Sequence, residues 1–184
     1  MAAPQRRWAA ELLHFWFHRL GPADWFGGGP EVDAALRDRF ARDLAMLSCR
    51  PAREFLADPQ IALAAVLLFD QVPRNIYRDS ALAFAFDPLA QAITRGALRR
   101  GWGARLGKQQ HQFLAMPLMH SEDMADQRRC LRIFRTLGPR YGLPFARSHY
   151  AMIARFGRFP HRNPVLGRES SRAERRAVAA GNSW

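Results

Sequence analysis

The sequence predicts an all-α protein, and three observations support this prediction. Apolar residues recur three or four positions apart, as they do on one face of a helix, for example at Leu36, Phe40 and Leu44. Proline, glycine and serine residues mark the points where such stretches begin or end. No stretch alternates apolar and polar residues as a strand would. With 184 residues, of which 48% are hydrophobic, the chain is long enough to form one helical domain over residues 1–184.

The first part of the chain contains several predicted helices. They cover 5–18, 31–47, Pro59 to Pro73, one or two short helices within 78–98, and 104–116. Pro59 suits a first helical turn, where the missing N–H of proline has no partner to lose. Asp87 directly precedes a proline and is a predicted N-cap. The glycine-rich turn "GPADWFGGGPE" is expected to lay Trp25 and Phe26 on another element, within an aromatic core.

The second part of the chain contains three more predicted helices. One runs from a Ser121 cap to about Leu137, one from Pro144 to near Gly157, and a short last helix follows a capping box. The capping box pairs Ser171 with Glu174. Short loops favour antiparallel packing of successive helices. The predicted architecture is therefore a single-domain antiparallel helical array.

The charge of the chain is strongly positive and unevenly distributed. Lys+Arg number 28 against 16 Asp+Glu, which gives +12, and Lys108 is the only lysine. Residues 128–184 contain 13 Arg and 2 acidic residues, a net charge of +11. Such a cationic third suits an acidic ligand or partner. The preference for arginine, with abundant alanine, glycine and proline, is typical of a GC-rich coding bias, so we expect no specific nucleic-acid partner.

Composition also bears on location. The longest apolar run, "IALAAVLLF" (61–69), is far shorter than the roughly 20 residues of a membrane span. No apolar stretch followed by a small-residue cleavage site marks a signal peptide. Cys49 and Cys130 form no disulfide framework and have no metal-ligand spacing. We therefore expect a cytoplasmic protein with no membrane partner, and the oligomeric state stays open.

Polar side chains occupy the apolar faces of three predicted helices. Asp70 and Arg74 continue the apolar stripe of the 59–73 helix. Asp123 and Gln127 share the apolar face of the next such helix, and His149 interrupts the apolar face of the 144–157 helix. Because unpaired charge is costly to bury, these groups are expected to meet one another or a ligand.

A basic loop, "RFGRFPHRNPVLGRES" (155–170), directly follows the last of these helices. Its prolines stiffen the chain, and its guanidinium groups suit a carboxylate or phosphate. We expect the loop to be ordered, partly buried and open to a pocket, with Arg158, His161 and Arg162 directed toward it. The acids predicted to balance these cations are Asp70, Glu122 and Asp123.

Three sequence blocks resemble the signature blocks of the bacterial family called domain of unknown function 924. They are "FDQVPRNIYR" (69–78), "MPLMHSEDMADQ" (116–127) and the basic loop, while "HFWF…WFGG" and "GNSW" are similar to the opening and closing segments of that family. The resemblance implies an all-helical fold like that of tetratricopeptide-repeat proteins, and no established activity. Phe69 stands where the family usually has leucine, and Val72 where it usually has phenylalanine. Both differences are expected to be exchanges between apolar side chains of the core. The motif positions carried over are Asp70, Gln71, Arg74, Asn75, His120, Glu122, Asp123, Gln127, His149, Arg158, His161, Arg162 and Asn163.

Structural interpretations of the same residues remain open. Asp70 and Arg74 can be an ordinary i,i+4 ion pair, and the basic loop can be a rigid plug whose arginines cap helix ends. Asp123 can neutralise a helix dipole. A metal site is not predicted: His14 and His18 lack a suitably spaced carboxylate, and arginines near the other histidines would repel a cation. No nucleotide or phosphate-loop motif is present, so no cofactor is predicted.

Three functions compete. The first is a pocket for a small anionic ligand, in which His149 or His161 moves protons with Asp123 orienting the ring. The remaining motif positions would then line the binding site, and the reaction type is not readable. The second is an adaptor of the tetratricopeptide kind that binds an acidic peptide in an exposed groove. The third is nucleic-acid binding through the C-terminal arginines, which would need exposed aromatic residues between them.

Overall fold

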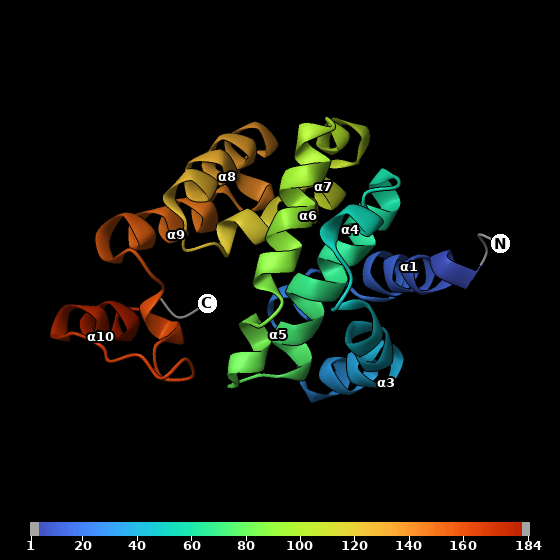
Figure 1. Cartoon of the computed structure of the whole chain (residues 1–184). Coiled ribbons are helices and arrows are strands. Elements are labelled where there is room, and N and C mark those ends of the chain that lie inside the picture. Colours follow the sequence, from blue (N-terminus) through green and yellow to red (C-terminus); the bar gives the residue numbers. More distant parts are fainter. Residues whose placement is uncertain (1–3, 182–184) are drawn as a thin grey trace.

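The computed structural model describes residues 4–181, which contain helices and connecting turns but no strand. This confirms the all-α prediction (Figure 1). The α-helices are α1 (Pro4–His14), α2 (Pro22–Phe26), α3 (Pro30–Leu47), α4 (Pro59–Val66), α5 (Val72–Ile76), α6 (Asp87–Arg99), α7 (Lys108–Met119), α8 (Met124–Leu137), α9 (Leu143–Phe156) and α10 (Arg172–Ala179). Short 3-10 and π turns extend or connect several of them.

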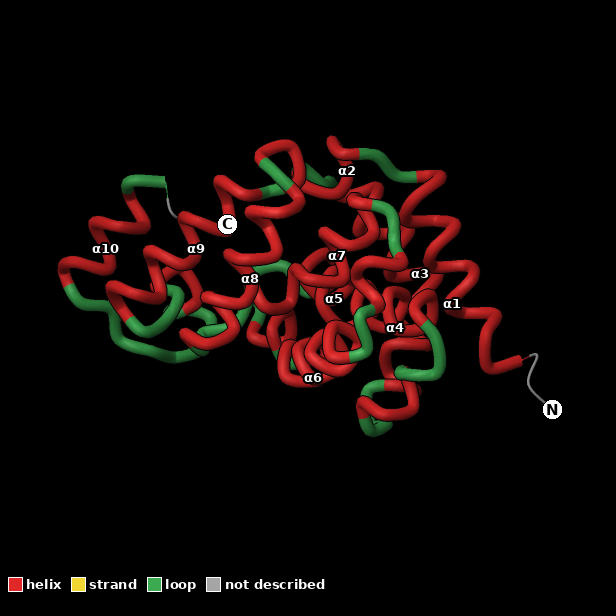
Figure 2. The backbone as a smooth tube through the Cα atoms, turned by 90° about the horizontal axis from the view of Figure 1, so that it is seen from above, coloured by secondary structure: helices red, strands yellow, loops and turns green. Residues whose placement is uncertain are grey.

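The helices pack largely in chain order. α1 lies on α4, α4 on α6, α6 on α7, α7 on α8 and α8 on α9. Figures 1 and 2 show α1 and α3 at one end of the molecule and α9 and α10 at the other, with α6 between them. The chain therefore forms a helical array in which the basic loop, between α9 and α10, lies at the end away from α1.

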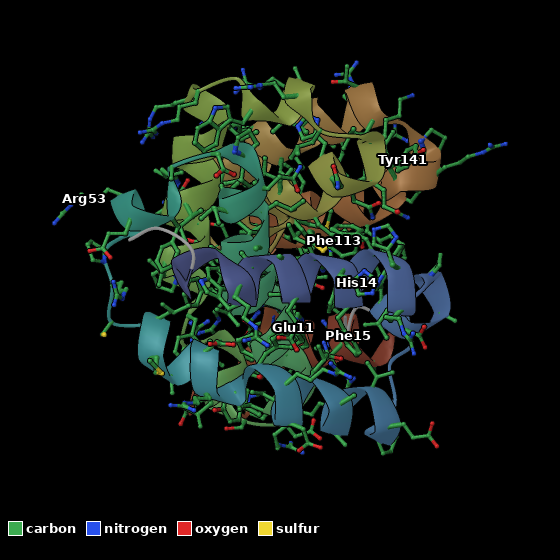
Figure 3. All side chains as sticks on the ribbon, turned by 90° about the vertical axis from the view of Figure 1, so that its right-hand side faces the viewer. Glu11, His14, Phe15, Arg53, Phe113 and Tyr141 are labelled. Carbon is green, nitrogen blue, oxygen red and sulfur yellow. The ribbon has the colours of Figure 1, made fainter. Side chains whose placement is uncertain are left out.

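Three hydrophobic clusters follow one another along this array. The largest joins the helices from α1 to α7 around Trp16, Phe40 and Phe69. In Figure 3, Phe15 lies below α1 on the side of α3, where its ring packs 5.9 Å from that of Phe40. A second cluster joins α7, α8 and α9, and a third joins α9, the basic loop and α10 around Phe159. The loop is thus anchored by its own apolar contacts.

Helix ends marked by glycine and by the capping box form as predicted. α8 stops before Gly138, and α9 stops before Gly157, whose φ of 70° suits glycine. Ser171 and Glu174 form the expected capping box at the start of α10. These signals act within one helical turn, and at these three positions the structure follows them.

The helix predicted to end at Pro73 continues to Ile76. Between α4 and α5 lies a π turn, Leu67–Gln71, in which the N–H of Val72 donates to the carbonyl of Leu67. In a regular α-helix a proline lacks the N–H for the next hydrogen bond and clashes with the carbonyl four residues earlier. The shift to five-residue spacing just before Pro73 relieves this conflict, and the helix goes on.

Two predicted N-caps are also corrected. α8 is capped by Asp123 instead of Ser121, since Asp123 Oδ1 accepts hydrogen bonds from the N–H groups of Ala125 (2.7 Å) and Asp126 (3.0 Å). Asp87 is the first residue of α6 and makes no cap. Its carboxylate is used elsewhere, as described below. Among residues 4–181, no helix combines the length and apolar character needed to cross a membrane.

Candidate functional site

Asp70 is the centre of a buried polar network. It lies in the π turn with its side chain fully buried. Its Oδ1 is 2.7 Å from His120 Nδ1 and 3.3 Å from Arg74 Nη1, and its Oδ2 accepts a hydrogen bond from Gln71 Nε2 at 2.5 Å. Burial alone would raise the pKa of Asp70, but Arg74 and His120 outweigh it and hold this pKa well below its usual value. Asp70 is therefore an ionised acceptor.

Arg74 joins Asp70 to a second carboxylate. Its Nη1 donates to the Asp70 carbonyl (2.6 Å), and its two terminal nitrogens grip both oxygens of Asp87 at 2.8 and 2.9 Å. Burial would lower the pKa of Arg74, but the two carboxylates raise it above its usual value. Asp70 and Arg74 are thus an i,i+4 pair, and also part of a larger network.

Arg162 reaches the same carboxylate from the basic loop. Its Nη1 lies 3.3 Å from Asp87 Oδ2, and its guanidinium lies 4.5 Å from the ring centres of both Phe84 and Phe159. Burial and the nearby charge of Arg74 lower the pKa of Arg162 to about 10. The buried Nε has no hydrogen-bond partner within residues 4–181. Arg162 is therefore a desolvated cation that shares its counter-charge with a second arginine.

Three histidines stand beside the arginines. The rings of His120 and His149 are 6.2 Å apart, and His149 packs 5.3 Å from Phe159, next to His161. Burial lowers the pKa of His149 to about 3 and that of His161 to about 4, with neighbouring positive charges acting in the same direction. Burial and Arg74 also lower the pKa of His120, against the pull of Asp70. At neutral pH these histidines are uncharged, so the positive charge comes from arginine.

Three adjoining hollows border the network. One of about 300 Å³ lies toward α2, α7 and α9 and is lined by Arg74, His120 and His149 among others. A second, of about 320 Å³, shares these three residues and adds His161 and Arg162. A third, of about 440 Å³, is lined by His120 and Arg162 together with Asp87 and Glu122. His120 lines all three, and Arg162 lines two.

Chemically, the arrangement combines anion-binding groups with a proton acceptor. Because ionised Asp70 can only accept, neutral His120 donates from Nδ1 and leaves Nε2 as an acceptor. A histidine held in this way by a buried carboxylate is suited to general-base chemistry. Within residues 4–181, no group of three or more His, Cys, Asp or Glu side chains is placed to hold a metal ion.

Several predicted site residues lie outside the network. Asp123 is exposed and serves as a helix cap, because α8 begins only after it, at Met124. Arg158 was expected to balance an acid of the pocket. Instead it donates to both oxygens of Glu174, at 2.7 and 3.1 Å, and so fixes α10 to the loop. That hydrogen bond lowers the pKa of Glu174 to about 2.

Glu122 has partners other than those predicted. Both of its oxygens accept from Arg168 Nη1 at 2.9 Å, and Oε1 also accepts from the Phe159 N–H at 2.8 Å. Its pKa is lowered by these contacts in spite of burial. Glu122, in the turn that precedes α8, therefore holds the basic loop in place beside the third hollow.

Of the predicted amide residues, two line a hollow and two make hydrogen bonds that stabilise the surrounding structure. Gln71 and Asn75 line the first hollow, where Asn75 Nδ2 donates to the Gln71 carbonyl at 2.9 Å. Asn163 is buried and donates to Ser170 Oγ at 3.0 Å, inside the loop. Gln127 is fully buried, and its Nε2 donates to the carbonyls of Met119 and Ser121, each at 2.7 Å. Gln127 thus binds the carbonyls at the end of α7 and lines none of the three hollows described above.

Replacing Gln127 with Met should destabilise the fold by about 1–3 kcal/mol, because buried carbonyls at the end of α7 lose their donor. Methionine nearly keeps the length and shape of glutamine. Urea unfolding at pH 7 measures the effect, with Gln109→Met at an exposed position of α7 as the control. Equal unfolding midpoints for both variants would show that the carbonyls do not depend on Gln127.

Asp87 and Phe84 are functional candidates that the sequence interpretation missed. Asp87 precedes Pro88 at a helix start, a pattern that equally fits a cap, and Phe84 was read as part of a short apolar helix. The only sequence signal for a further buried carboxylate was that the arginines of the predicted site outnumber the acids expected near them. Asp87 supplies that missing charge.

Fold and site together define an all-α protein with a buried arginine–carboxylate–histidine network facing several hollows. The chain belongs to the family described as "Bacterial protein of unknown function (DUF924)", whose sequence pattern matches residues 12–182. This confirms the resemblance, although most of the closing "GNSW" lies outside the described residues. A similar solved structure is "Structure of Protein of Unknown Function ATU0120 from Agrobacterium tumefaciens". It is 36% identical, covers 94% of this chain and 97% of that chain, and superposes with a TM-score of 0.88. No curated protein matches the chain.

Proposed function

We propose that the protein binds a small anionic molecule at Arg74 and Arg162. The observation that carries the proposal is the state of Arg162. Its side chain is 7% exposed, yet it shares Asp87 with Arg74 through a single contact of 3.3 Å. Its Nε lacks a partner within residues 4–181. A buried cation with so little compensation is suited to a charged ligand.

The surroundings of Arg162 would strengthen such binding. Phe84 and Phe159 flank the guanidinium and keep water from its faces, and charge-assisted hydrogen bonds are stronger where water is excluded. Phosphate and carboxylate match the planar fork of arginine. Neutral His120, His149 and His161 would add hydrogen bonds without adding charge.

The same site would support acid–base chemistry on the bound anion. Asp70 orients His120, so Nε2 of His120 is the group best placed to accept a proton from a ligand or a water molecule. His149 and His161 line the second hollow as well and stay candidates for a second proton-transfer role. Asp123 caps α8, and its predicted role of orienting a histidine ring stays a prediction.

The adaptor hypothesis is the weaker alternative. An adaptor that binds an acidic peptide would display its arginines along an open groove, as tetratricopeptide-repeat adaptors are expected to do. Arg74 and Arg162 are instead partly or fully buried and meet at one carboxylate. Convergence at one point favours a small ligand over an extended chain.

Inorganic phosphate should raise the thermal unfolding midpoint of the protein above that in chloride of equal ionic strength at pH 7. Arg162→Gln should lose this gain. A ligand that binds only the folded state stabilises it by about 2.7 kcal/mol at 100 times its dissociation constant. Because phosphate also stabilises proteins non-specifically, the difference between variants is the decisive measurement.

The control for charge is Arg132→Gln, which removes one exposed arginine from α8 and leaves the network intact. Arg132→Gln should keep the whole phosphate-dependent gain. If both variants lose it equally, phosphate binds through net charge alone. If Arg162→Gln keeps it, the anion does not bind at Arg162.

A further inference from the structure

The proposed anion site does not account for the apolar side chains of the first hollow. The hollow of about 300 Å³ is lined by apolar side chains from three helices: Trp25 and Phe26 from α2, Met116 and Met119 from α7, and Phe145 from α9. Phe26 is 59% exposed and Phe145 is 54% exposed, whereas most aromatic side chains of this protein are buried or half-buried. Large exposed rings beside a hollow are typical of a binding surface.

Contacts within the protein hold the rings of Trp25 and Phe26 in place. Trp25 Nε1 donates to the Trp16 carbonyl at 2.9 Å, and the Trp25 ring packs edge-on against Phe113 with ring centres 5.3 Å apart. Phe26 stacks on Phe113 at 6.3 Å with an angle of 6° between the rings. Figure 3 marks Phe113 above α1. The surface therefore exists before any ligand arrives, which limits the entropy lost on binding.

The turn after α2 also fits closely against a basic side chain of the site. Gly28 has a φ of 57°, and a Cβ atom there would lie 2.4 Å from Arg78 Nη2. Only glycine accepts both this conformation and this close approach without strain. The turn carrying Trp25 and Phe26 is thus placed directly beside Arg78, which Asp33 holds through hydrogen bonds of 2.5 and 2.9 Å.

The first hollow, with its aromatic lining, adjoins the second hollow, which contains Arg162. Arg74, Arg78, His120 and His149 line both of them. A ligand can therefore present an acid group to Arg74 and Arg162 on one side and an apolar group to Trp25 and Phe26 on the other. His120, which lines both hollows, would face the bond that joins the two parts.

We propose that the ligand is an amphipathic acid, namely a phosphate or carboxylate attached to an aromatic or compact apolar group. The inference rests on the proposed anion site and adds a neighbouring binding site for the apolar part of the ligand. The acid group binds at Arg162 and Arg74, and the apolar group binds against Trp25, Phe26 and Phe145. Inorganic phosphate fills only the first part of such a site.

Calorimetric titration of the full chain with inorganic phosphate and with phenyl phosphate, at equal pH and ionic strength, tests this inference. Phenyl phosphate should bind at least about tenfold more tightly, since burying a phenyl ring contributes that much or more. Its binding should also show a more negative heat-capacity change, the mark of buried apolar surface.

The double variant Phe26→Ala and Phe145→Ala should bring the ratio of the two affinities close to one. Both side chains are mostly exposed, so their removal should leave the fold intact. Met46→Ala, which removes an exposed apolar side chain of α3 that lines neither hollow, is the matched control and should keep the ratio.

The outcomes separate this inference from the proposed function. If phenyl phosphate binds no more tightly than inorganic phosphate, or if the double variant keeps the preference, the amphipathic ligand is refuted while the anion site stands. If neither compound binds, both proposals fail. Tighter binding of phenyl phosphate that depends on the two phenylalanines supports the inference.

Discussion

Asp70→Asn should lower the free energy of unfolding by about 3–5 kcal/mol at pH 7, the cost typical of removing one partner from a buried ion pair. The change keeps the shape of the side chain but removes its charge. His120, Gln71 and Arg74 would all lose an ionised acceptor. Urea unfolding measures the effect, and Asp38→Asn at an exposed site of α3 serves as control.

The cost should depend on pH in a defined direction. Because the folded-state pKa of Asp70 is lowered, its charge stabilises the fold above the unfolded pKa of about 3.9. This contribution declines as pH falls below that value toward the folded-state pKa. The difference between wild type and Asp70→Asn should therefore be largest near pH 7 and smaller at pH 3. Equal losses from Asp70→Asn and Asp38→Asn would show that the network does not depend on Asp70.

Asp87→Asn should both destabilise the protein and increase its response to phosphate. Arg74 and Arg162 would lose the carboxylate that they share, at a cost of about 3 kcal/mol. Phosphate bound between the two arginines would replace the lost charge. The midpoint of thermal unfolding should therefore rise more with added phosphate in this variant than in the wild type.

Asp126→Asn is the matched control for this experiment. Asp126 is a buried carboxylate whose two oxygens both accept hydrogen bonds from Arg95, and within residues 4–181 it pairs with neither Arg74 nor Arg162. Its replacement should cost stability without a larger phosphate response. If phosphate raises the midpoints of both variants equally, the anion does not occupy the place between Arg74 and Arg162.

The sequence was informative at several helix ends where the deciding interaction is local, although two of the predicted N-caps were wrong. Glycine at 138 and 157 and the Ser171–Glu174 capping box act within one turn, and they appear where predicted. Helical spacing also placed Asp70, Arg74 and His149 on inward faces correctly. The π turn before Pro73 was not predicted, because it reflects a compromise between a proline and the packing of a long helix.

Asp87 and Asp123 show why the charge pairs could not be predicted. Each is an acid near a helix start, so either can cap the helix or reach a distant cation. The sequence predicts a cap at Asp87 and an ion pair at Asp123, whereas in the structure Asp87 pairs with Arg74 and Asp123 caps α8. The choice depends on which arginine lies nearby in space, and no short-range pattern carries that information. The same holds for Arg158, whose partner is Glu174.

The order in which a ribosome makes the chain gives the network a further significance. Arg162 follows Asp87 by 75 residues, whereas the largest hydrophobic cluster is complete by Met116. Protein synthesis adds about 5–20 residues per second from the N-terminus. A growing chain therefore acquires its main core, with Asp70, Arg74 and Asp87 already present, before the second arginine has been made. A chain whose synthesis stopped between Met116 and Arg162 would hold most of the apolar core and lack half of the cationic pair.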